Sequence, residues 1–188
     1  MTIQPAGTEL SYTVTWLEMT ARPEYGWPTL PATHPATLLH AVDPPAWYFL
    51  ALYDAVGRDY AWEDMHAEDP GELAAWLRKP EVSLFTLMMD GWPQGFFLLD
   101  AIEPDTTDLC YFGLVPEAVG KGLGKYLLRT AILTAWDREG IGKLTVNTCT
   151  LDHPRALQTY QANGFSPVRR ADFTRTLTRH RDLSRIPD

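Results

Sequence analysis

The chain has 188 residues, a length that suits one domain. Hydrophobic residues make up 45% and charged residues 21%, which excludes a disordered polar chain. The formal charge of −8 argues against a general affinity for nucleic acid, because that affinity comes mostly from Lys and Arg side chains that neutralise phosphates. Two cysteines are too few for a disulfide framework or a zinc site, so no metal is expected.

The start of the chain lacks the pattern of a signal peptide, a basic segment followed by an apolar run. No apolar run reaches the roughly 18 residues that a membrane-spanning helix needs. We therefore expect a cytoplasmic protein that does not contact a membrane. We also expect one domain over residues 1–188, with a core of about residues 10–177 and a charged C-terminal tail over 178–188.

The first half of the chain predicts a strand, a loop and two helices. β-Branched and aromatic residues predict the strand over 11–17, and several prolines predict an irregular loop over 22–35. An apolar run predicts a helix over 46–56. The run Asp69-Pro70-Gly71-Glu72 is typical of a second helix start, and that helix should end near Arg78.

The second half predicts three successive strands and then an alternation of helix and strand. Asp90-Gly91 predicts a hairpin turn between the first two of these strands. The seven expected elements cover residues 82–89, 95–102, 107–115, 122–139 (helix), 143–149, 154–162 (helix) and 167–177. Successive strands favour antiparallel pairing, whereas a strand–helix–strand unit favours a parallel step. The predicted fold class is α/β (α+β), with a mixed, mostly antiparallel central sheet flanked by helices.

A glycine-rich turn precedes the long helix. Gly120, Gly122 and Gly124 allow a tight turn and a close approach of a ligand to main-chain N–H groups. The first N–H groups of a helix lack internal partners and the helix dipole favours an anion there, while Lys121 and Lys125 add positive charge. The turn therefore predicts a phosphate site. The alternative is a turn that only packs the helix.

Two common phosphate motifs do not fit this turn. The nucleotide P-loop needs Ser or Thr after Gly-Lys, and Tyr126 stands there. A dinucleotide-binding fingerprint belongs to a fold of parallel strands, whereas three antiparallel strands are predicted before this turn.

The run Val119-Gly120-Lys121-Gly122-Leu123-Gly124 resembles the acetyl-coenzyme A loop of the GCN5-related N-acetyltransferases. A second block, residues 146–165, resembles that family's penultimate strand, short helix and closing Gly-Phe. The resemblance covers residues 82–177 well and the earlier chain loosely. It implies an acyl-CoA N-acyltransferase fold, with acetyl-CoA as cosubstrate and direct attack by a primary amine.

The resemblance also implies roles for individual residues. The backbone around residues 119–125 would hold the pyrophosphate of the cofactor, and the end of the preceding strand would pair with the pantetheine arm. Val119 replaces the usual Gln or Arg, and His153 replaces an Asn, so those two contacts are altered. The implied cofactor-binding residues are Leu114, Val115, Val119, Gly120, Lys121, Gly122, Leu123, Gly124, Lys125 and His153.

Tyr160 and Asp108 are the predicted catalytic residues. Tyr160 lies where the family often has a tyrosine that protonates the departing thiolate, and a tyrosine is protonated at neutral pH. Asp108 lies where some members have a carboxylate that accepts the amine proton, since an ammonium cannot attack a thioester. The alternatives are a core tyrosine and a solvent-facing aspartate. Other carboxylates remain candidates for the base: Glu63, Asp64, Glu103 and Asp105.

Several further residues have two interpretations. His153 precedes Pro154 and also fits a helix cap. Cys110 and Cys149 are expected to be small apolar residues, because no paired base is evident for a nucleophile. Five aromatics in the early helical region either pack on the sheet or line an acceptor pocket with Glu63 and Asp64: Trp47, Tyr48, Tyr53, Tyr60 and Trp62.

The predicted function is acetylation of a small-molecule amine, by a monomer or homodimer. The negative charge and the aromatics favour a small cationic or aromatic acceptor over a protein tail. One alternative is a non-catalytic coenzyme A-binding sensor of the same fold, favoured by the departures at Val119 and His153. The other is an unrelated phosphate-binding domain.

Overall fold

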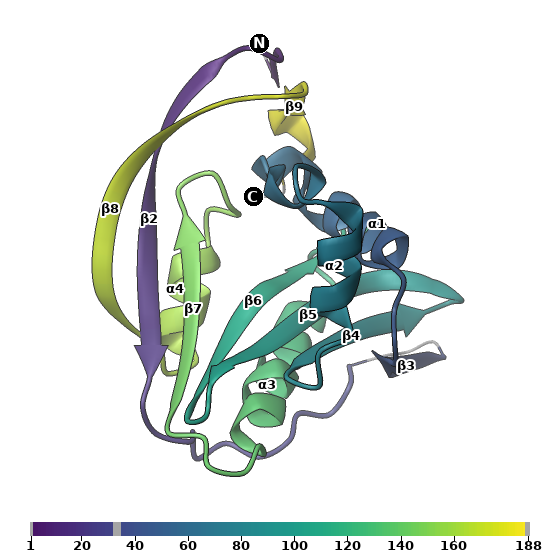
Figure 1. Ribbon diagram of the computed structural model, residues 1–188, viewed down its shortest axis with the longest axis vertical. Coiled ribbons are helices and arrows are strands. Elements are labelled where there is room, and N and C mark those ends of the chain that lie inside the picture. The colour runs from purple at the N-terminus through teal and green to yellow at the C-terminus, as the bar shows by residue number, and fades with distance from the viewer. Residues whose placement is uncertain (1, 32–34, 187–188) are drawn as a thin grey trace.

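A computed structural model describes residues 2–31 and 35–186 of the chain (Figure 1). The strands are β1 Ile3–Gln4, β2 Glu9–Met19, β3 Ala36–Ala41, β4 Val82–Met89, β5 Trp92–Glu103, β6 Thr106–Leu114, β7 Lys143–Cys149, β8 Ser166–Thr176 and β9 Arg181–Asp182. The α-helices are α1 Ala46–Gly57, α2 Pro70–Leu77, α3 Leu123–Trp136 and α4 Ala156–Ala162. Short 3₁₀ helices are η1 Arg58–Tyr60, η2 Asp64–His66, η3 Pro116–Ala118 and η4 Leu183–Arg185.

Seven strands form one sheet in the order β3-β4-β5-β6-β7-β2-β8, and β1 pairs with β9 in a separate two-stranded sheet. Every neighbouring pair in the large sheet is antiparallel except β6 and β7, which are parallel. The predicted mixed, mostly antiparallel sheet flanked by helices is therefore confirmed. Asp90 and Gly91 both have positive φ, 55° and 84°, as the predicted hairpin turn between β4 and β5 requires.

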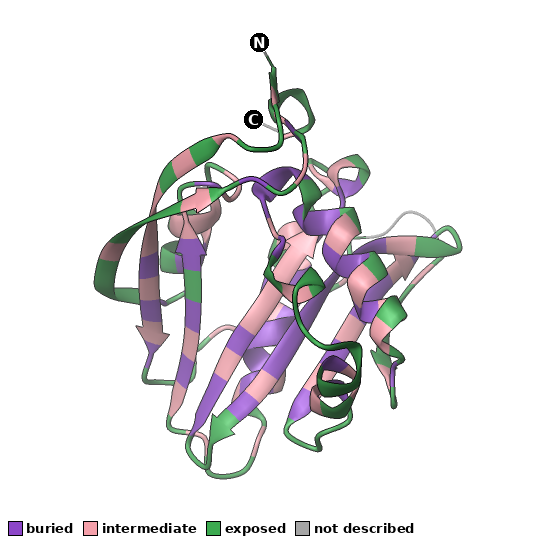
Figure 2. Cartoon of the chain, turned by 45° about the horizontal axis from the view of Figure 1, so that its top comes forward, coloured by how far each residue is buried: buried purple, intermediate pink, exposed green. Residues whose placement is uncertain are grey.

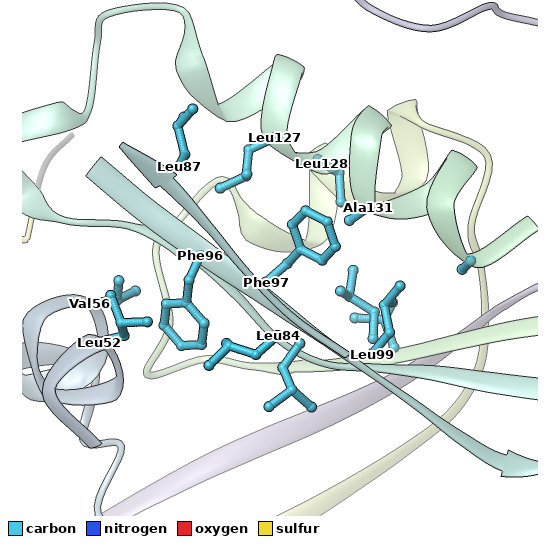
Figure 3. Close-up of a cluster of buried hydrophobic side chains, with 14 of the residues drawn as sticks. Leu52, Val56, Leu84, Leu87, Phe96, Phe97, Leu99, Leu127, Leu128 and Ala131 are labelled. Carbon is cyan, nitrogen blue, oxygen red and sulfur yellow. The ribbon is translucent and has the colours of Figure 1, made fainter. Parts of the chain in front are cut away.

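The helices lie on two opposite faces of the sheet, and adjacent residues of β5 point to different faces. Phe96 lies beside Leu52 and Val56 of α1, whereas the next residue, Phe97, points toward the side of α3 (Figure 3). We call these sides the α1 face and the α3 face. Helix α2 lies with α1, because Trp76 of α2 contacts Phe49 of α1. The alternation places apolar side chains under helices on both faces.

Some predicted boundaries differ from the structure. Helix α4 begins at Ala156 rather than at Pro154, and α3 ends at Trp136 rather than at Glu139. Strand β3 was not predicted, because a six-residue edge strand next to a proline-rich segment has a weak pattern. The predicted loop over 22–35 has no helix or strand in its described part, and residues 32–34 lie outside the described residues.

The C-terminal segment is more ordered than a charged tail suggests. Strand β9 pairs with β1, and Arg181 is buried with 6% exposure. Its guanidinium donates to the backbone carbonyls of Asp59, 2.7 Å away, and Leu151, 2.8 Å away. Arg181, one of the basic residues of the predicted charged tail, instead connects this segment to the segments around Asp59 and Leu151.

Candidate active site

Strands β6 and β7 separate above their first few residues. They pair only from Thr106 with Lys143 to Asp108 with Thr145, although β6 continues to Leu114 (Figure 1). The β5–β6 register shifts just above this point, where Cys110 is the extra residue of β6. We call the opening above Asp108 the β6–β7 gap. Backbone groups of β6 that face the gap are open to an extended ligand, as at a sheet edge.

The predicted phosphate turn lies between the upper end of β6 and α3. Gly120 and Gly122 have φ of 84° and 76°, a conformation that favours glycine. A Cβ placed on Gly120 would meet nothing within 4 Å, so space is open beside the backbone there. Among the described residues, no side chain caps the start of α3. The free N–H groups of its first turn and the helix dipole make this end of α3 suitable for an anion.

The structure limits how individual turn residues can act. The N–H of Val119 already donates to Pro116 at 3.2 Å, and that of Val115 donates to Gln94 at 2.9 Å. The side chains of Val115 and Leu123 are apolar and buried, so they offer no polar contact to a ligand. The ammonium of Lys121 lies 5.9 Å from the centre of the Trp92 ring. The groups at this turn that could bind an anion are therefore backbone N–H groups from Gly120 onward.

His153 lies in the connection between β7 and α4. Its Nδ1 accepts a hydrogen bond from the backbone N–H of Arg155, and its carbonyl accepts one from Ala156. Burial lowers the pKa of His153, and the charge of Arg155 lowers it further. The ring therefore favours the neutral form and closes the turn before α4, but His153 is not the helix cap that the sequence suggested. Pro154 is not the first helical residue, since Arg155 is the N-cap of α4.

Tyr160 of α4 lies on the α3 face beside the gap. Its ring packs against Phe112 of β6 and Phe165, and it is 7% exposed. Phe112 pairs in register with Phe97, so Phe112 and the Tyr160 ring packed against it lie on the α3 face. Burial strongly raises the pKa of Tyr160, and the charges of Asp152 and Asp108 raise it further. The hydroxyl is therefore held in its protonated form, as a general acid requires.

Asp108 lies at the base of the gap, not at a solvent-facing strand start. It stands opposite Asp100 of β5, whose carboxylate accepts a hydrogen bond from Trp76 of α2, so both aspartates are on the α1 face. The hydroxyl of Thr145 donates to Asp108 at 2.5 Å. Burial raises the pKa of Asp108, and the charge of Asp100 raises it further. These effects outweigh the hydrogen bond from Thr145, which lowers the pKa. A carboxylate with a raised pKa is a stronger base.

The rival carboxylates are placed less well for a base. Glu103 is the last residue of β5 and Asp105 lies in the β5–β6 turn, both below the gap. Asp64 forms an ion pair with Arg175 at 2.7 Å. Glu63 is buried and accepts a hydrogen bond from the N–H of Thr178.

Two further residues lie at the gap, Trp62 and Asp152, and of these only Asp152 was missed by the sequence reasoning. The indole Nε1 of Trp62 donates to Oδ1 of Asp152 at 3.1 Å. Oδ2 of Asp152 accepts from the hydroxyl of Thr148 at 2.7 Å and from the N–H of Cys149 at 2.8 Å. Trp62 was one of five candidate aromatics, and Asp152 directly precedes His153 in the second block. The motif spacing, however, pointed only to His153 and Tyr160.

The other early aromatics separate into two groups. Tyr53 and Tyr60 are buried in the fold, as the packing alternative predicted. Trp47 and Tyr48 line a groove of about 570 Å³ between α1 and the ends of β5 and β6. Cys110 and Cys149 are half-buried free thiols, and burial raises the pKa of Cys149 to about 11.

Metal and membrane features were also examined in the described part of the chain. There, no group of three or more His, Cys, Asp or Glu side chains is arranged to hold a metal ion. No helix within residues 2–31 or 35–186 has the length and apolar character needed to cross a membrane.

The sequence model of the Acetyltransferase (GNAT) family matches residues 20–165, which include the gap, the glycine turn and Tyr160. The chain therefore belongs to the GNAT acetyltransferase family. No curated protein matches the sequence.

Solved structures share the fold at low sequence identity. A tandem GNAT protein from the clavulanic acid biosynthesis pathway has a TM-score of 0.61 and 15% identity, covering 92% of this chain and 55% of that one. A GCN5-related N-acetyltransferase from Sphaerobacter thermophilus has a TM-score of 0.57 and 14% identity, covering 93% and 53%. An aminoglycoside acetyltransferase from an uncultured soil metagenomic sample, solved with trehalose, has a TM-score of 0.54 and 14% identity, covering 68% of this chain and 86% of that one. The chain thus spans little more than half the length of the first two.

Proposed function

We propose that this protein transfers an acetyl group from acetyl-CoA to a primary amine of a small molecule, by direct attack. The observation that carries the proposal is the position of the gap. It opens directly above Asp108 and runs alongside β6 toward the glycine turn. One extended cofactor can therefore place its diphosphate at the start of α3 and its thioester between the two predicted catalytic side chains.

The residues around the gap suit acetyl-CoA, which supplies an activated acyl group as a thioester. Backbone N–H groups from Gly120 to Lys125 would bind the diphosphate, because the helix start is uncapped and Gly120 leaves open space. The free backbone edge of β6 up to Leu114 would bind the pantetheine arm. The missing side-chain contact at Val119 means that the backbone carries this recognition.

Asp108 and Tyr160 have complementary roles on opposite faces of the sheet. Asp108 takes the proton of the amine on the α1 face, which lets the nitrogen attack the acyl carbon. The new N–C bond forms as the C–S bond breaks, and the sulfur takes the proton of Tyr160 on the α3 face. The raised pKa of Asp108 supports its role, since Asp108 becomes a stronger base, and Tyr160 carries its proton at neutral pH.

The acceptor class rests on the charge of the chain and on one structural relative. The net charge of −8 favours a cationic acceptor. The aminoglycoside acetyltransferase that shares the fold is named for a small-molecule acceptor. We therefore propose a small amine, and we propose the cytoplasm as its location.

The test measures thiol release from acetyl-CoA over a panel of amines, with the wild-type protein and Tyr160→Phe. The variant should lose about 100-fold or more in kcat. Its affinity for acetyl-CoA and its Tm should match the wild type, because among the described residues the hydroxyl has no hydrogen-bond partner. Unchanged turnover would remove Tyr160 from the mechanism.

A second candidate, a non-catalytic coenzyme A-binding module, is favoured by the residues at the altered positions. Val119 offers no polar side chain, and His153 hydrogen-bonds within its own turn. Stabilisation of the protein by acetyl-CoA without thiol release from any amine would support this candidate. Stabilisation by nucleotides and not by coenzyme A would support an unrelated phosphate-binding domain.

A further inference from the structure

Different residues flank the β6–β7 gap on the two faces of the sheet. On the α3 face lie Tyr160 and the start of α3, which the proposed function assigns to the cofactor. On the α1 face lie Asp108 and, higher along β6, Tyr111. If the cofactor and the general acid occupy the α3 face, as the proposed function assigns them, the amine reaches the acyl carbon from the α1 face, where the proposed base also lies.

Trp62 crosses this opening from the loop after η1. Its ring contacts Tyr111 of β6 with centroids 5.6 Å apart, and its indole N–H donates to Asp152, in the turn after β7, at 3.1 Å. The side chain thus connects the β6 side of the gap with the β7 side. The indole therefore lies on the α1 side of the gap, between Tyr111 of β6 and Asp152 after β7.

The position of Trp62 is fixed from two directions. Its carbonyl accepts a hydrogen bond at 2.7 Å from Arg179 of the C-terminal segment. Its ring lies so close to Gly57 that a Cβ at that position would be 2.2 Å from the indole. Only glycine at position 57 permits this placement, so the backbone of α1 and the ring are packed as one unit.

Asp152 has capacity for one more hydrogen bond beside Trp62. A carboxylate has about four acceptor positions. Oδ2 uses two, for Thr148 and Cys149, and Oδ1 uses one, for Trp62. Among the described residues, no Lys or Arg forms an ion pair with Asp152. Its charge also raises the pKa of Tyr160, which is consistent with a position near the same gap.

We propose that Asp152 and Trp62 form the acceptor-binding site, which takes primary amines that are unbranched at the carbon next to nitrogen. Oδ1 of Asp152 accepts a hydrogen bond from the acceptor ammonium and holds it above Asp108. The indole narrows the opening and excludes branched amines. This inference rests on the proposed function, since it assigns the acceptor side of the same gap.

The experiment compares the wild type with Trp62→Leu and Asp152→Asn on two series of primary amines, unbranched and branched at the carbon next to nitrogen. Trp62→Leu should raise kcat/KM for branched relative to unbranched amines by about 10-fold, the effect of relieving roughly 1.4 kcal/mol of steric cost. Asp152→Asn should raise KM for the amine by about 10-fold or more, because a hydrogen bond to a charged group is lost. Neither variant should change KM for acetyl-CoA.

Matched controls separate these effects from a damaged fold. Thr148→Val removes a donor to the other oxygen of Asp152, so it should lower Tm and leave KM for the amine unchanged. Trp27→Phe changes an exposed tryptophan in the segment between β2 and β3 and should leave both amine series unchanged. The dissociation constant of acetyl-CoA confirms that each variant is folded.

The outcomes distinguish the two levels of proposal. If the wild type binds acetyl-CoA and releases no thiol with any amine, the proposed function fails and the acceptor site fails with it. If the wild type turns over but Trp62→Leu keeps the wild-type preference and Asp152→Asn keeps the wild-type KM, only the acceptor site is overturned. A KM effect of Thr148→Val equal to that of Asp152→Asn would also overturn it, since the loss would then come from the loop.

Discussion

The two halves of the seven-stranded sheet, on either side of the β6–β7 gap, are stabilised differently. Strands β4 and β5 are largely buried, with helices on both faces (Figure 2). Strand β8 at the opposite edge is mostly exposed along its length. The first half is a scaffold stabilised by apolar burial, whereas the second half depends more on strand pairing and polar contacts.

Polar contacts from the C-terminal segment connect the two halves across the top of the molecule. Arg175 of β8 donates to the carbonyl of Ala61, and Arg179 donates to that of Trp62. Arg181 reaches both Asp59 and Leu151, which lie on different sides of the gap. The gap therefore lies between a half of the sheet that is largely buried and a half that these arginines connect to it.

The largest expected effect is a core truncation in the covered half. Phe97→Ala should lower the free energy of unfolding by about 3–5 kcal/mol, because a fully buried ring is lost and a cavity remains. Phe173→Ala, in β8, removes a ring that is 41% exposed and stacks on Tyr12, so it should cost about 1 kcal/mol or less. Urea denaturation measures both, and equal losses would contradict the contrast between the halves.

The next effect concerns the connection across the gap. Arg181→Met should lower the free energy of unfolding by about 2–4 kcal/mol, since two buried carbonyls lose their donors. The control Arg170→Met affects an exposed arginine that donates to Thr15 and should cost under about 1 kcal/mol. If both variants show the same midpoint in urea, the C-terminal segment does not hold the two halves together.

A smaller effect is expected at the glycine turn. Gly120→Ala should cost about 1–2 kcal/mol of stability, because φ of 84° is strained for alanine. Gly7→Ala has the same backbone strain, φ of 86°, and also has open space around its Cβ, so it is the matched control. Only Gly120→Ala should weaken acetyl-CoA binding, by about tenfold, measured by calorimetry. Equal affinities for the two variants would place the diphosphate elsewhere.

The smallest effect is a pH dependence at Asp108. Its raised pKa means that the folded protein binds this proton more tightly than the unfolded chain does. The contribution of Asp108 to stability therefore falls as pH rises from the unfolded pKa of about 3.9 to the raised folded pKa, and stays low above it. Asp108→Asn should be more stable than the wild type at pH 7, with a smaller advantage at pH 4. Thermal unfolding at several pH values checks this, and a less stable variant at pH 7 would contradict it.

The fold could be predicted largely because its elements have strong local signals. Strand β7 matches its predicted bounds of 143–149, and α1 differs by one residue at its end, because periodicity and terminators are local properties. The two-residue strands β1 and β9 pair only through contacts distant in sequence, so no local pattern marked them. Boundaries of α4 shifted because His153 and Arg155 form their own turn before the helix.

The parts of the candidate site that lie within a sequence motif could be predicted, whereas the parts formed by segments distant in sequence could not. Tyr160 and the glycine turn lie in blocks with characteristic spacing, and the structure places both beside the gap. Trp62 and Asp152 come from segments ninety residues apart and meet only in the folded chain. The pairing of Asp108 with Asp100 likewise follows from strand register, which the sequence alone did not specify.

The place of β2 between β7 and β8 has a consequence for how the chain folds. Residues 9–19 are synthesised long before their partners, residues 144–149 and 166–176. Until those are made, an eleven-residue strand stays unpaired, and the sheet closes only through contacts of very high sequence separation. Folding should therefore be slow, and the nascent chain should expose a strand edge that can aggregate until β8 has been synthesised.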